Sequence, residues 1–152
     1  MPYKRVQPHT KEEAEEIFAQ GTSEQICDAL LGVTYYVGDW RWVQSACLKS
    51  LESSDMLVQE IAILCLGHLA TFHRILDLAV VIPALQAHIS QPELASALHR
   101  ALDDIAFQVE DKSYFRENWG KLPLRIRETL IENKIFNPNG KFIYKGRRFA
   151  VK

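Results

Sequence analysis

Three groups of side chains in this sequence have residue types that could do chemistry. Cys65 and His68 are three residues apart, with His73 further on, and 103–104 and 110–111 are neighbouring pairs of acids. Zinc sites need three or four ligands at repeated short spacings, which are not present here. Neighbouring residues on a helix point about 100° apart, so neither acid pair makes an acid–base couple. We therefore expect no metal, no cofactor and no catalytic residue.

The motifs of common catalytic sites are also missing. The sequence contains no glycine-rich phosphate loop, no Gly-x-Ser-x-Gly elbow and no His-Glu-x-x-His pair. His88 and His99 are single histidines on expected helices, where a structural role is the commoner one. We therefore expect that the protein is not an enzyme and that it acts by binding.

Trp42 is the first candidate binding residue. Trp40 and Trp42 begin an expected helix, and residues two apart cannot share one face of it. Trp40 lies three residues before the apolar Val43, so Trp42 is the better candidate for exposure, and an exposed Trp is a favoured interface anchor. The alternative is that Trp42 packs against the next helical pair or against Tyr35 and Tyr36.

Acidic side chains form the second candidate surface. They lie on the outward face of a helix expected over 91–109 and continue past its end: Glu93, Asp103, Asp104, Glu110 and Asp111. Such a surface attracts a basic protein at low salt. We predict that Trp42 and these acids bind another protein with a basic surface.

The C-terminal segment is basic and aromatic. Lys141, Lys145, Arg147 and Arg148 alternate with aromatic side chains, a composition typical of a nucleic-acid contact. They are candidate contacts to nucleic acid or to an acidic partner. The alternative is a hairpin edge that Lys and Arg keep soluble.

Charge is unevenly distributed along the 152 residues, whose net charge is −1. Residues 1–111 hold 16 acidic and 7 basic side chains, and residues 112–152 hold 3 acidic and 11 basic ones. This asymmetry indicates either a charged partner or two parts of the molecule that attract each other. The apolar share of 47% and charged share of 24% are those of a globular protein, and we expect one domain over 1–152.

Cysteine use and hydropathy bear on the compartment. The three cysteines, Cys27, Cys47 and Cys65, lie on or beside apolar helical stripes, and their odd number argues against a disulfide framework. The apolar run over 76–85 is too short to cross a bilayer, and residues 1–11 lack the apolar region of a secretory signal. We expect a cytoplasmic protein with no membrane contact.

One pattern of apolar residues occurs twice, 36 residues apart. Both copies read i, i+3, i+4, i+7, i+8, i+11, i+12, which is one face of a helix. The first copy is Val58, Ile61, Ala62, Cys65, Leu66, Leu69 and Ala70, and the second is Leu94, Ala97, Leu98, Ala101, Leu102, Ile105 and Ala106. A helical unit that repeats at this period predicts stacked helical pairs.

Seven helices and one hairpin are expected. Thr10 with Glu13 and Ser90 with Glu93 have the spacing of capping boxes, and Asp39 and Asp55 are N-cap residues. Apolar periodicity changes from 3.6 to 2 near the C-terminus, which predicts a short β-hairpin. The expected helices cover 11–20, 23–37, 39–52, 55–72, a segment including 81–89, 91–109 and 122–134, and the hairpin covers 141–151.

The segment after Asp55 resembles a HEAT repeat of the armadillo-like class. The likeness extends over 39–109, with Gln44 and Gln59 where the family often has Arg. It is carried by Asp55, Val58, Ala62, Leu66, Gly67 and Leu69, followed by Ile82, Pro83, Ala84 and Leu85. The resemblance implies an all-α fold, a short right-handed α-α superhelix of about three helical hairpins over 22–134. The segment 1–21 would be an N-terminal cap helix, and 135–152 a small basic β-hairpin.

This resemblance also implies a mode of action. HEAT-like proteins bind other proteins, and small bacterial immunity proteins of this type neutralise a cognate toxin. We expect a module that sequesters or inhibits a partner protein. An adaptor or scaffold subunit is one alternative. A nucleic-acid binder similar to HEAT-like DNA glycosylases is another, although these need a basic groove and residues 39–111 are acidic overall.

Overall fold

The computed structural model describes residues 5–152, and these residues form an all-α structure with no sheet. Eight α-helices are joined by two short 3-10 helices, η1 and η2. Their bounds are α1 Lys11–Gln20, α2 Ser23–Tyr36, α3 Trp40–Ser50, α4 Met56–His73, α5 Leu78–Gln86, η1 Pro92–Leu94, α6 Ala95–Gln108, α7 Ser113–Glu117, η2 Trp119–Lys121 and α8 Leu124–Glu132.

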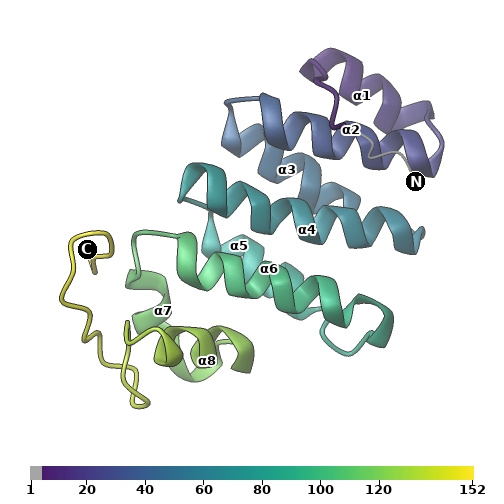
Figure 1. Cartoon of the computed structure of the whole chain (residues 1–152). Coiled ribbons are helices and arrows are strands. Elements are labelled where there is room, and N and C mark those ends of the chain that lie inside the picture. The colour runs from purple at the N-terminus through teal and green to yellow at the C-terminus, as the bar shows by residue number, and fades with distance from the viewer. Residues whose placement is uncertain (1–4) are drawn as a thin grey trace.

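The helices form two layers (Figure 1). α2, α4, α6 and α8 follow one another in the first layer, and each contacts the next. α3 and α5 lie behind this layer, α1 packs on α2 at one end, and the C-terminal segment lies beside α7 and α8 at the other. The first layer therefore presents one continuous outer face made from four helices.

The repeated apolar stripe forms the centre of the core. Every residue of its two copies on α4, η1 and α6 is buried except Ile61, which is half-buried. α4 is long and apolar enough to span a membrane by length and composition alone. In this structure it packs against α2, α3 and α6, as expected for a central helix.

Gly67 lets α4 and α6 approach closely. A Cβ atom at this position would lie 3.0 Å from the Cα of Ala101 on α6 and 3.2 Å from Oδ2 of Asp104. A glycine inside a helix costs about 1 kcal/mol relative to alanine, so its presence here is explained by the close contact that it permits.

Three of the expected helix caps are confirmed. Oγ1 of Thr10 accepts a hydrogen bond from the backbone N–H of Glu13 at 3.1 Å. The carboxylates of Asp39 and Asp55 accept the backbone N–H groups of Trp42 and Leu57, at 3.2 and 2.9 Å. These local signals fix where α1, α3 and α4 begin.

Other helix boundaries differ from expectation. The helix expected to include 81–89 is α5, which contains Pro83 in its interior and ends at Gln86, so His88 and Ile89 fall outside it. The box predicted for Ser90 and Glu93 does not form, because the segment starts as the 3-10 helix η1 with Gln91 at its N-cap. Helices α7 and η2 were not predicted.

The prediction of a C-terminal β-hairpin is wrong, because no such hairpin forms within residues 5–152. The segment 141–152 pairs with earlier parts of the chain, through isolated bridges between Phe136 and Phe142 and between Asp111 and Ala150. Phe149 is buried and its ring packs edge-on against Phe107 of α6, with centroids 5.7 Å apart. Because this ring is buried, the end of the chain packs on the helices and does not pair with the other half of the predicted hairpin.

The substitution Gly67→Leu should lower the free energy of unfolding by at least about 1 kcal/mol, because the new side chain would collide with the backbone of α6. Chemical denaturation followed by circular dichroism measures it. Gly38→Leu is the matched control, since a Cβ at Gly38 meets nothing within 4 Å. Equal stability of the two variants would contradict this packing.

Candidate functional site

Three rings lie together on the outer face of α2 and α4. Tyr35 packs edge-on against His68 and Phe72, with ring centroids 5.8 and 5.1 Å apart, and His68 stacks on Phe72 at 6.2 Å. Tyr35 is 43% exposed and Phe72 is 48% exposed. We call Tyr35, His68 and Phe72 the aromatic cluster. Exposed aromatic side chains that are held in place by each other are typical of protein interfaces.

Asp104 lies beside this cluster. It is half-buried on α6, with its carboxylate next to Gly67. Burial raises the pKa of Asp104, and the neighbouring charge of Asp103 adds to this, while His68 and Arg100 act in the opposite direction. Burial lowers the pKa of His68, so its ring is mainly neutral at pH 7. The net charge beside the aromatic cluster therefore depends on whether the carboxyl group of Asp104 is ionised.

Asp103 joins α6 to α8. Its carboxylate accepts two hydrogen bonds from Arg125, at 2.5 and 2.8 Å, and one from Oγ1 of Thr129 at 2.8 Å. Burial raises the pKa of Asp103, but these hydrogen bonds outweigh it and the pKa lies below its usual range. Asp103, Asp104, Arg125 and Thr129 line a shallow groove of about 320 Å³ between α6 and α8.

The remaining predicted acids lie apart from one another. Glu93 is exposed on η1, at the opposite end of the α6 segment from Glu110. Glu110 is exposed and lies 3.8 Å from Nε of Arg74. Asp111 accepts a hydrogen bond from the backbone N–H of Ser113 at 3.0 Å, where the C-terminal segment pairs with the chain. Only Asp103 and Asp104 share one groove.

Trp42 lies in a different region of the molecule. It is half-buried against α1, where its indole N–H donates to Glu15 at 3.4 Å and Nζ of Lys11 lies 5.6 Å from the ring. It lines a groove of about 690 Å³ between α1 and α3, together with Phe18 and Ile26. The packing partner is α1 rather than Tyr35, Tyr36 or the next helical pair.

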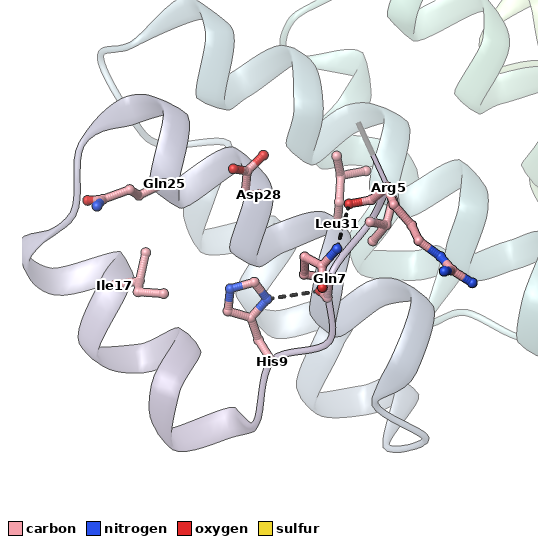
Figure 2. A pocket seen from close by; sticks show the side chains of 8 residues that line it. Arg5, Gln7, His9, Ile17, Gln25, Asp28 and Leu31 are labelled. Carbon is pink, nitrogen blue, oxygen red and sulfur yellow. Dashed lines mark hydrogen bonds between the residues drawn. The ribbon is translucent and has the colours of Figure 1, made fainter. Parts of the chain in front are cut away.

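A third pocket, of about 430 Å³, lies between α1, α2 and the N-terminal segment. Figure 2 shows His9, Ile17, Gln25 and Asp28 around it. Nδ1 of His9 is 3.1 Å from the carbonyl oxygen of Gln7, and both residues lie over Gly32 of α2, which leaves them room because it has no side chain. The close packing of these two residues over Gly32 holds the N-terminal segment against α2.

The basic C-terminal residues have two different roles. Lys141, Lys145 and Arg147 are exposed. Arg148 is partly buried, its guanidinium carbon is 5.0 Å from the ring centroids of both Phe107 and Phe149, and it donates a hydrogen bond to Gln108. Arg148 therefore fixes the C-terminal segment to α6, and the other three face solvent.

Lys112 is fully buried, a position that its sequence context did not predict. Its Nζ donates to the carbonyl oxygens of Ala106 and Phe107 at the end of α6 and lies 4.1 Å from the ring centroid of Phe149. Burial lowers the pKa of Lys112 to about 7. No sequence signal separates this lysine from its exposed neighbours.

The aromatic cluster was also missed, but its sequence signal exists. His68 and Phe72 are four residues apart on α4, outside the repeated stripe, so one helix turn brings them together.

Cys65 belongs to the stripe and is fully buried, as expected, and Cys27, Cys47 and Cys65 are all free thiols. Residues 5–152 contain no group of three side chains able to hold a metal ion.

The bond between Asp103 and Arg125 should stabilise the docking of α8 by about 1 kcal/mol, since it is bidentate but partly exposed. A double-mutant cycle with Asp103→Ala and Arg125→Ala, read by denaturation, measures this coupling. The more exposed, singly bonded pair of Lys11 and Asp39 is the control and should show a smaller coupling. A coupling of zero for Asp103 and Arg125 would contradict the structural role.

Stability should rise with pH above about 7 because of Lys112. Its folded-state pKa lies below the usual 10.5, so the unfolded chain binds more protons between these values and unfolding becomes less favourable as pH rises. Between about pH 7.5 and 8.5 the contribution is up to about 1.4 kcal/mol per pH unit.

This contribution should disappear in Lys112→Met and remain in Lys145→Met, which alters an exposed lysine. Urea denaturation of the three proteins at several pH values provides the comparison. Identical pH dependence in all three would refute the assignment to Lys112.

No protein-family model and no curated protein matches the sequence. Among solved structures, the chain is similar to one in the crystal structure of a CDI complex from Cupriavidus taiwanensis LMG 19424, with 29% identity and a TM-score of 0.65. The alignment covers 71% of this chain and 96% of that chain. Nearly all of that chain therefore has a counterpart in this one.

Proposed function

We propose that this chain is a non-catalytic protein-binding module that neutralises a cognate toxin, as an immunity protein does. The observation that carries the proposal is the similarity to a chain of a CDI complex, which extends over 96% of that chain. CDI stands for contact-dependent inhibition, and a complex of that kind is one that a toxin and its immunity protein would form. The similarity supports binding to another protein.

The helical arrangement supports a HEAT-like reading of the fold. We infer that the two layers form a short right-handed α-α superhelix. Where HEAT repeats often have Arg, Gln44 accepts the backbone N–H of Asp77 at 2.8 Å and Gln59 donates to the carbonyl oxygen of Leu51 at 3.1 Å. These amides link α3 to the start of α5 and α4 to the end of α3, as an inter-repeat ladder would.

The partner that we propose has a basic surface. Asp104, Glu93 and Glu110 are the predicted acids whose side chains carry no strong structural bond. They would raise the rate of association with a basic protein, an effect that salt weakens. We place this action in the cytoplasm, where the three free thiols would stay reduced.

Nucleic-acid binding is the second candidate, and the exposure of Lys141, Lys145 and Arg147 favours it. Gel shift on generic RNA and DNA tests it. Binding that weakens steeply with salt and is lost when these three residues become Gln would support it. Deleting 141–152 is unsuitable as a test because Phe149 belongs to the core.

If a neighbouring reading frame encodes the proposed cognate toxin domain, co-expression of this chain should restore growth of bacteria that produce that domain. The triple variant Glu93→Lys, Asp104→Lys, Glu110→Lys should lose this protection, because it places positive charge opposite a basic surface. The control is Glu12→Lys, Glu16→Lys, Glu117→Lys, which makes the same charge change on α1 and α7 and should still protect.

Both variants are compared at equal expression, with growth rate and co-purification as readouts. A complex without protection would favour an adaptor or scaffold. A wild-type chain that neither binds the toxin domain nor restores growth would refute the proposal.

A further inference from the structure

Asp104 has an unusual environment for a carboxylate. It is half-buried, and within residues 5–152 it forms no hydrogen bond and no ion pair, whereas the adjacent Asp103 accepts three hydrogen bonds. Solvent reaches its carboxylate oxygens, although partial burial still disfavours the charged form. The carboxylate of Asp104 therefore has unused capacity to accept hydrogen bonds.

Within residues 5–152, the cationic side chains near Asp104 do not donate a hydrogen bond to its carboxylate. Arg100 lies one helical turn before Asp104 and interacts with it only through the electrostatic field. Burial lowers the pKa of His68, so its ring is mainly neutral at pH 7 and supplies little positive charge. Arg125, which lines the same groove, is bonded to Asp103. A cation that bonds Asp104 would have to come from outside the chain.

The aromatic cluster provides rings that such a cation could also contact. Asp104 and the cluster lie on the same part of α4, because the carboxylate lies against Gly67 and the next residue, His68, contacts both Tyr35 and Phe72. A guanidinium is attracted to the face of an aromatic ring, and it donates two parallel hydrogen bonds to a carboxylate. Lysine offers a point charge and stacks less well, so the chemistry favours arginine.

We propose that Asp104 and the aromatic cluster form a binding site for one arginine side chain of the partner protein. The guanidinium would bond the carboxylate of Asp104 and pack on Tyr35 and Phe72. This inference rests on the proposed function, because it names the residue type that the partner inserts. It assigns the centre of the interface to α2, α4 and α6.

Titration of the ¹⁵N-labelled chain with N-acetyl-L-arginine methylamide tests the site without the partner. We expect millimolar affinity, with shifts of backbone amides around Tyr35, His68 and Asp104. The matching citrulline compound has the same shape without the charge and should bind at least about tenfold more weakly. Shifts of equal size with both compounds would overturn the proposal.

Variants separate the site from general surface effects. Asp104→Asn and Phe72→Ala should each weaken arginine binding, Asp104→Asn by about tenfold. Asp104→Asn should unfold at the same or a higher denaturant concentration, since partial burial disfavours the charged carboxylate that it removes. Glu12→Gln and Leu124→Ala alter an exposed acid and an exposed apolar residue elsewhere, and should bind as the wild type does.

The outcomes distinguish the two proposals. A chain that protects against the toxin but binds the two compounds equally would refute the arginine site alone. A chain that binds arginine at this site but does not protect against the toxin would refute the proposed function alone. Unchanged arginine binding by Asp104→Asn would also refute the site, whatever the result with the toxin.

Discussion

The close contact between α4 and α6 is the constraint on which the rest of the structure depends. It brings Gly67 so close to α6 that a Cβ atom at this position would lie 3.0 Å from the Cα of Ala101. α2 and α3 then pack on α4, and α8 packs on α6. A larger side chain at this point would separate the layer at its centre, where α4 positions α2 and α3 and α6 positions α8.

The same contact shapes the outer face. Because Gly67 has no side chain, the carboxylate of Asp104 fits against α4, close to His68 and its aromatic neighbours. The helices α4 and α6 therefore take part in both the core contact and the candidate binding site. A charge that lowers stability is kept at a position where a partner could use it, which is common in functional sites.

The features that could be predicted from the sequence are those determined by residues close together in the chain. The stripe starting at Val58 and the caps at Thr10, Asp39 and Asp55 involve neighbours within a few residues, and the structure confirms them. The fate of Asp103, Lys112 and the C-terminal segment depends on contacts between residues far apart in sequence. Phe149 reaches α6 across some forty residues, so alternation within the segment wrongly predicted a hairpin.

Hydrogen exchange of the chain with and without the proposed cognate toxin domain tests the central claim most directly. That claim is that the outer face of α2, α4 and α6 covers the partner. Binding should slow exchange of backbone amides around Tyr35, Phe72 and Asp104, and leave α3 and α5 unchanged. Slowing confined to the groove beside Trp42 or to 141–152, with these three helices unaffected, would contradict it.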